Sequence, residues 1–127
     1  MTHEFKPVVY LKDGCPFSFK LRVALLEMGL LDKVQIQTFS TGTPAEAEIR
    51  HRLSVKIEKV SFPSAEISPG EFKGESDALI AYFGHKYRIA LESLTTLSAY
   101  VEGPFNKLLR LSKENRELKK AATNSCG

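Results

Sequence analysis

The chain has 127 residues, of which 43% are hydrophobic and 26% charged, a composition typical of one soluble globular domain. Its net charge of +3 is mild, and Lys and Arg alternate with Glu, which argues against a nucleic-acid-binding stripe but allows a small anionic ligand. The sequence has neither a run of about 18 apolar residues nor a secretory pattern at its start, so we expect a cytoplasmic protein that does not span a membrane.

The first predicted elements are a strand and a helix. A β-branched and aromatic run at residues 7–11 predicts a buried strand, which the turn Lys12-Asp13-Gly14 ends. A helix is expected from Pro16, because proline suits the first helical position. Helical spacing predicts a buried stripe and leaves the charged side chains outward. The stripe comprises Phe19, Val23, Leu26 and Leu30, and the outward residues are Lys20, Arg22 and Glu27.

A second strand is predicted at residues 34–39, where apolar and polar residues alternate with period two. Together with the preceding strand and helix it forms a strand–helix–strand unit, whose two strands must be parallel in one sheet. The next helix is expected to open at Thr43-Pro44 and to end near Leu53.

Residues 60–67 and 70–74 predict two short strands of a hairpin, joined by a turn rich in Pro and Gly. Ser76 is placed to cap the helix that follows and extends to Tyr87. The resulting order, β-α-β-α-β-β-α, predicts an α/β domain over residues 1–87.

Residues 88–127 predict a short C-terminal helical extension and tail. Its apolar stripe consists of Leu91, Leu94, Leu97 and Val101. We expect this stripe to pack against the same domain, the alternative being a homodimer that pairs through these helices. Gly103-Pro104 is expected to break the helical run, and residues 113–120 to form solvated helix.

Two cysteines, Cys15 and Cys126, lie nearly a chain length apart, so they predict neither a disulfide framework nor a metal site. Cys15 stands at the predicted start of a helix, where unpaired amides and the positive end of the helix dipole stabilise a thiolate. We expect its sulfur to be exposed and reactive; the alternative is a small buried residue at a turn.

The segment Lys12-Asp13-Gly14-Cys15-Pro16-Phe17-Ser18, followed by a helix that contains Arg22-Val23-Ala24-Leu25, resembles the active-site segment of glutaredoxins. It is even more similar to the N-terminal domain of cysteine-type glutathione transferases such as the omega class. The resemblance covers roughly residues 7–87. It implies a thioredoxin-like fold with a four-stranded mixed sheet and flanking helices. It also implies that Cys15 forms a mixed disulfide with bound glutathione, beside Pro16 and Phe17.

A second landmark is Lys59-Val60-Ser61-Phe62-Pro63, which resembles the segment in which the family has a cis-proline beside the catalytic cysteine. The resemblance implies that the backbone of Phe62 pairs with the cysteinyl part of glutathione, as an added strand would. The alternative is an ordinary trans proline at the start of a strand.

A third landmark, Gly74-Glu75-Ser76-Asp77, resembles the Glu-Ser pair that holds the γ-glutamyl end of glutathione. Ser76 and the first amides of the helix can bind a carboxylate, and Glu75 or Asp77 can meet an ammonium group. The alternative is a plain helix cap. Lys12 and Lys59 are the candidates for the glycine carboxylate.

Ser18 stands where dithiol glutaredoxins have a second cysteine, so a monothiol cycle is predicted. The serine hydroxyl is then a candidate donor to the thiolate. We therefore expect a glutathione-dependent thiol–disulfide oxidoreductase or glutathione-transferase-like protein, with a glutathionylated or small disulfide substrate. The alternatives are a non-catalytic glutathione-binding or protein-interaction module and, less favoured because of Pro16, an iron–sulfur carrier. Some forty residues after the domain argue against a conventional second-substrate pocket, unless another subunit completes the cleft.

Overall fold

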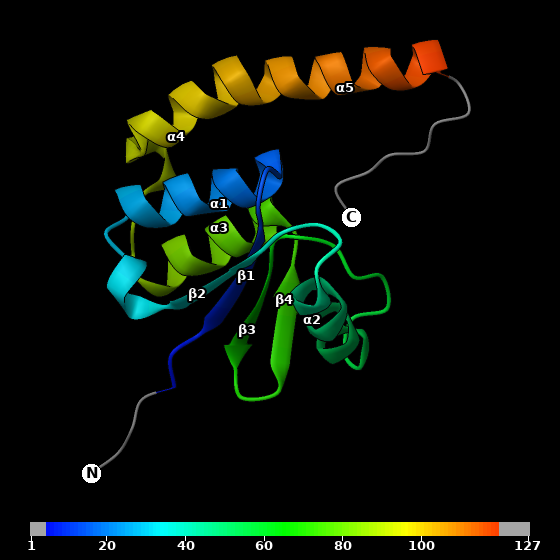
Figure 1. Cartoon of the computed structure of the whole chain (residues 1–127). Coiled ribbons are helices and arrows are strands. Elements are labelled where there is room, and N and C mark those ends of the chain that lie inside the picture. The colour runs from blue at the N-terminus through cyan, green and yellow to red at the C-terminus, as the bar shows by residue number, and fades with distance from the viewer. Residues whose placement is uncertain (1–4, 120–127) are drawn as a thin grey trace.

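The computed structural model describes residues 5–119 (Figure 1). The domain elements are β1 (Val8–Lys12), α1 (Pro16–Glu27), β2 (Gln35–Phe39), α2 (Pro44–Ser54), β3 (Ser64–Ser68), β4 (Glu71–Gly74) and α3 (Ser76–Lys86). The C-terminal elements are α4 (Thr95–Tyr100), the π-helical segment η3 (Val101–Phe105) and α5 (Asn106–Lys119). Short 3₁₀ turns lie at Leu31–Lys33 and Leu91–Ser93. The predicted order and the helical extension are confirmed, and the expected tail lies outside the described residues.

The four strands form one mixed sheet in the order β2-β1-β3-β4. The central strand β1 pairs in parallel with β2, where Val9 faces Ile36, and antiparallel with β3, where Val9 faces Ala65. The parallel pairing confirms the predicted strand–helix–strand unit, and β3 and β4 form the predicted hairpin. This sheet with its flanking helices is the thioredoxin-like α/β arrangement expected from the sequence.

Alternate residues of β1 point into two apolar cores, one on each face of the sheet. Val9 and Leu11 belong to the core that α1, α3 and α4 cover, whereas Tyr10 belongs to the core under α2. Figure 1 shows α1 and α3 side by side and α2 apart from them. The end of β1, where Cys15 follows, is therefore held from both faces.

The predicted facing of α1 is wrong. Leu21, Ala24 and Leu25 form its buried side, whereas Phe19 and Leu26 are 50% and 63% exposed. Because apolar residues occupy most positions of this helix, its sequence allows more than one stripe at helical spacing. Of the expected stripe, Leu30 is buried and Val23 half-buried.

Two charged side chains of α1 that were expected to face outward have distant partners instead. Lys20 is buried and forms an ion pair with Asp77 at the start of α3. The Glu27 carboxylate accepts hydrogen bonds from the amides of Thr96 at 2.9 Å and Leu97 at 2.8 Å, and so caps α4. Arg22 is only half-buried. Partners this far along the chain could not be predicted from local spacing.

Two predicted boundaries also differ. The strand β3 begins at Ser64 and not at residue 60, so the Phe62-Pro63 segment precedes the strand. Ser76 is the first residue of α3 and not its cap; the cap position is Glu75, whose φ of 73° carries the chain from β4 into the helix.

The C-terminal extension packs on the domain, as expected. Leu94 and Leu97 are buried in the core shared by α1 and α3, although Leu91 remains exposed. Gly103-Pro104 does interrupt the α-helical run, but as a π-helical segment through which the chain continues into α5. Of the stretch 113–120 predicted to be solvated helix, residues 113–116 have exposed side chains, as expected, and the side chains beyond them lie outside the described part. Over the described part of the chain, we find no helix with the length and apolar character needed to cross a membrane.

Candidate functional site

Cys15 occupies the N-cap position of α1, directly after the turn that ends β1. Gly14 makes that turn with a φ of 77°, and the Cys15 amide donates to the carbonyl oxygen of Lys12 at 3.2 Å. Pro16 then starts the helix, as predicted. Cys15 therefore stands at the end of α1 where the helix dipole favours negative charge, although its side chain makes no capping hydrogen bond to the first-turn amides.

The Cys15 sulfur also lies against the loop that precedes β3. Its Sγ is 3.9 Å from the carbonyl oxygen of Phe62, to which the thiol donates. The Phe62–Pro63 peptide is cis, as the resemblance implied. The expectation of an exposed sulfur is wrong, since Cys15 is only 2% exposed. Its sulfur lies against the Phe62 carbonyl group, and Tyr100 and Leu108 of the C-terminal extension lie over the turn that holds it.

Ser18, the other residue predicted to be catalytic, is buried one turn into α1. Its Oγ accepts a hydrogen bond from the amide of Lys12 at 3.0 Å. This bond closes the β1–α1 turn around Cys15 and gives Ser18 a structural task. Donation from its hydroxyl to the thiolate stays a prediction.

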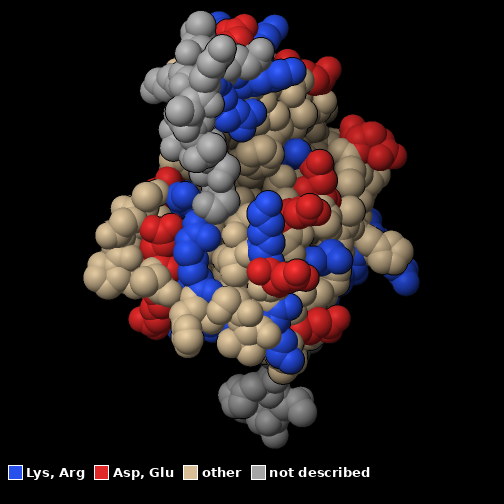
Figure 2. Space-filling view, turned by 90° about the vertical axis from the view of Figure 1, so that its right-hand side faces the viewer, with Lys and Arg blue, Asp and Glu red and all other residues tan. Residues whose placement is uncertain are grey.

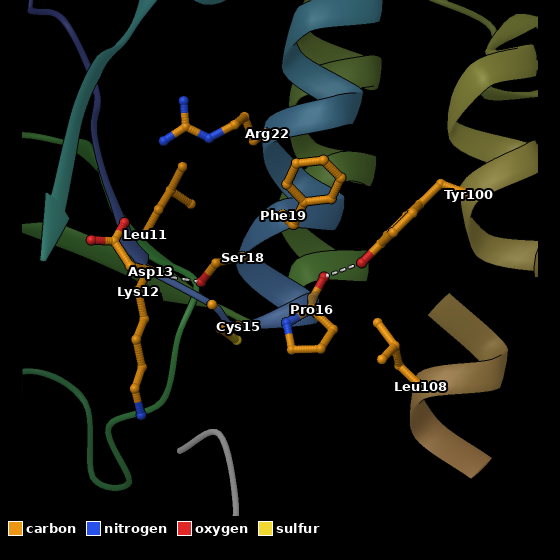
Figure 3. A pocket seen from close by; sticks show the side chains of 11 residues that line it. Leu11, Lys12, Asp13, Cys15, Pro16, Ser18, Phe19, Arg22, Tyr100 and Leu108 are labelled. Atoms are coloured by element: carbon orange, nitrogen blue, oxygen red, sulfur yellow. Dashed lines mark hydrogen bonds between the residues drawn. The ribbon is translucent and has the colours of Figure 1, made fainter. Parts of the chain in front are cut away.

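The Cys15 cavity is a hollow of about 380 Å³, lined by the turn at residues 11–16 and by Phe19, Tyr100 and Leu108 among others. Figure 3 shows Tyr100 and Leu108 approaching this turn from the C-terminal extension. The Tyr100 hydroxyl donates to the carbonyl oxygen of Pro16 at 3.0 Å. Burial raises the pKa of Tyr100, and the charge of the nearby Cys15 raises it further.

A second hollow, the α5 cleft, continues from Cys15 along the C-terminal helix and has a volume of about 670 Å³. Leu108, Leu109, Ser112, Lys113 and Arg116 of α5 form one wall, and Lys12, Asp13, Gly14, Pro16, Phe17 and Thr41 lie opposite. None of these α5 residues was predicted from the sequence to belong to the site. The spacing of the α5 residues, i, i+3, i+4 and i+7 from Leu109, is the signal that could have indicated a shared face. One chain therefore forms a cleft at Cys15 without a second subunit.

Phe105 fixes the extension to the site. It is 4% exposed, and its ring packs edge-on against Phe17 with the centroids 5.2 Å apart. The Nζ of Lys20 lies 4.7 Å from the same ring centroid, and the Tyr100 ring is 5.6 Å away. Cation and edge-to-face contacts of this kind orient aromatic rings as well as burying them. The wall of the cleft is thus anchored next to Cys15.

The residues predicted to bind glutathione fall into separate places. Lys59 and Glu75 line one cavity of about 530 Å³, together with Ser61 and Ser64, which flank Phe62-Pro63 in the chain. Phe62 reaches Cys15 itself. The structure therefore brings the cis-proline loop to the thiol, and the cavity beside this loop is lined by the cation Lys59 and the anion Glu75.

The other predicted ligands lie elsewhere. Asp77 is engaged with Lys20 and lines a hollow facing α4, and Ser76 is buried at the start of α3. Lys12 belongs to both hollows at Cys15 and not to the cavity of Lys59. Lys12 and Lys59 thus offer charge on different sides of the thiol.

The sheet order, the flanking helices and a cysteine at the start of the first helix define a protein of thioredoxin-like fold with a cleft at its thiol. Compared with models of protein families, with curated proteins and with solved structures, the chain finds no match in any of the three. Within residues 5–119, no three His, Cys, Asp or Glu side chains come together in a way that could hold a metal ion.

Proposed function

We propose that the chain is a glutathione-dependent monothiol oxidoreductase, related in mechanism to glutaredoxins and to cysteine-type glutathione transferases. The observation that supports this most is the position of Cys15. Its sulfur lies at the start of α1, 3.9 Å from the Phe62 carbonyl oxygen, and opens onto two hollows. A purely structural cysteine would need none of these hollows.

The chemistry begins with the thiolate, the nucleophilic form of a cysteine. The Cys15 thiolate attacks the glutathione sulfur of a mixed disulfide, and the electron pair of the broken S–S bond leaves with the substrate sulfur. A Cys15–glutathione disulfide results. The thiolate of a second glutathione then attacks the bound glutathione sulfur, which releases oxidised glutathione and restores the Cys15 thiolate.

Glutathione is proposed to lie along the cis-proline loop. Its cysteinyl backbone would pair with Phe62, as a peptide added to a sheet edge does. The cavity beyond this residue offers Lys59 for a carboxylate and Glu75 for the ammonium group of the γ-glutamyl end. This arrangement leaves the α5 cleft, on the other side of Cys15, for the second half of the disulfide.

One observation favours a second candidate, a non-catalytic module that binds glutathione or a protein. The Cys15 side chain is 2% exposed, and the C-terminal extension is anchored over α1 by Phe105. An attacking thiolate needs access to a disulfide sulfur, so this burial favours binding without turnover.

The two candidates are separated by Cys15→Ser, with Cys126→Ser as the matched control because it removes the other cysteine. We expect the native chain and Cys126→Ser to form a glutathione adduct, seen by mass spectrometry, and to deglutathionylate a peptide in the presence of glutathione. Cys15→Ser should do neither. If the native chain forms no adduct, or if Cys15→Ser retains turnover, the oxidoreductase proposal is wrong.

A further inference from the structure

The α5 cleft has an uneven charge. Three cations line it, Lys12 from the end of β1 and Lys113 and Arg116 from α5, against one carboxylate, Asp13. The Asp13 carboxylate already accepts a hydrogen bond from the Ser40 hydroxyl at 3.0 Å. The lining of the cleft is therefore electropositive beside the thiol.

The cations of α5 divide between two sides of the helix. Lys113 and Arg116 lie on the side that lines the cleft, whereas Lys107, Arg110 and the acidic Glu114 lie outside the lining. All five side chains are exposed to solvent. Figure 2 shows several Lys and Arg side chains at the top of the molecule, with Asp or Glu side chains beside them. Cations thus lie on both sides of α5, and Lys113 and Arg116 are the ones that line the cleft.

The remainder of the lining is largely apolar. Pro16 and Phe17 lie on one wall, and Leu108 and Leu109 on the other. A small molecule in such a cleft buries its carbon skeleton between these side chains, while a few charged groups set its orientation. The cleft therefore suits a ligand with a short apolar part and an acidic group.

From this we infer that the α5 cleft selects the substrate by charge, and that the preferred substrates are mixed disulfides of glutathione with small carboxylate-bearing thiols. The inference rests on the proposed function and names the substrate class of the same site. When the Cys15 thiolate attacks the glutathione sulfur, the other half of the disulfide leaves as a thiolate. This leaving group then carries two negative charges in the cleft, its carboxylate and its new thiolate. Lys113 and Arg116 stabilise both charges there.

The expected size of the effect follows from the exposure of these cations. An ion pair between exposed groups contributes about 0.2–1 kcal/mol, so two cations together change the preference for an anion by about 2- to 30-fold. Salt should reduce the preference, because charges exposed to solvent are screened over about 8 Å at 0.15 M ionic strength.

The test uses three glutathione disulfides of similar size, made with 3-mercaptopropionate, 2-mercaptoethanol and cysteamine, whose second halves are anionic, neutral and cationic. The quantity measured is kcat/KM for the disulfide at fixed glutathione. In the two-step cycle proposed, this parameter reports the first half-reaction and is independent of the second. Lys113→Gln/Arg116→Gln is compared with Lys107→Gln/Arg110→Gln, which removes the same two charges from the other side of α5.

The native chain and the Lys107→Gln/Arg110→Gln control should prefer the anionic over the cationic disulfide. In the cleft variant the ratio of the two kcat/KM values should fall by about 2- to 30-fold. Because the two kcat/KM values are compared within each variant, a change in the reactivity of Cys15 that affects all the disulfides equally cancels in their ratio. Equal kcat/KM for the three disulfides in the native chain, or an equal loss in both variants, would overturn the charge-selection inference alone. Failure of the native chain to turn over any of them would instead overturn the proposed function.

Discussion

Phe105→Ala should loosen the packing of η3 and α5 on the domain, because its ring packs directly against Phe17 of α1. The ring is 4% exposed and contacts Phe17, Tyr100 and the Nζ of Lys20. Truncating a buried Phe to Ala costs about 3–5 kcal/mol, and we expect about 3 here because the ring lies at the margin of the core. With a urea m-value of about 2 kcal/mol/M, the unfolding midpoint should fall by about 1.5 M.

The assay pairs urea unfolding with the rate at which iodoacetamide alkylates Cys15, in a Cys126→Ser background so that only one thiol reacts. Alkylation should be faster in Phe105→Ala, because α5 no longer covers the cleft. Leu26→Ala is the control, since Leu26 is 63% exposed on α1 and its truncation should cost no more than about 0.5 kcal/mol. Equal stability losses for the two variants, or unchanged alkylation in Phe105→Ala, would refute the anchoring role.

Two further predictions concern titrating groups. The amide of Thr96, followed by that of Leu97, lowers the pKa of Glu27 in the folded chain from its ordinary value of 4.5. The stability that the Glu27 carboxylate contributes is therefore present above about pH 4.5 and is lost as the pH falls through the lowered pKa of the folded state. Glu27→Gln should therefore be less stable than the native chain at pH 7 and show a flatter loss between pH 5 and pH 3 in urea titrations; parallel curves would contradict the capping role. Burial and then the charge of Cys15 raise the pKa of Tyr100. Cys15→Ser should therefore lower the pKa of Tyr100 part of the way toward 10.0, as measured by an NMR titration of its ring carbon. An unchanged pKa would argue against a charged sulfur near this phenol.

Local signals in the sequence were enough to predict the frame of the site. A proline after Cys15 marks the start of α1, and period-two alternation marks β2, so the strand–helix–strand unit could be predicted without tertiary information. The resemblance at Phe62-Pro63 located the loop that contacts the thiol. These features depend on residues adjacent in the chain.

What could not be predicted depends on contacts between distant segments. Lys20 looks like a surface lysine until Asp77, 57 residues later, is folded against it. The cleft is another case, because α5 lines it from far along the chain and Lys113 and Arg116 look like ordinary solvated cations. The burial of Cys15 follows from the same tertiary packing. Periodicity identifies a helix but does not say which of its sides another helix will cover.

The width of the α5 cleft depends on the direction in which α5 leaves the π-helical segment η3. Figure 1 shows α5 joined to the rest of the chain at one end, through η3 and α4. Arg116 lies about three helical turns beyond Phe105, a distance of about 16 Å along the helix axis. A rotation of α5 by about 5° around Phe105 would move Arg116 by about 1.4 Å, close to the rise of about 1.5 Å per residue along a helix. The opposite wall, at Lys12 and Gly14, belongs to the turn after the central strand, so such a tilt of α5 would change the width of the cleft and leave Cys15 in place.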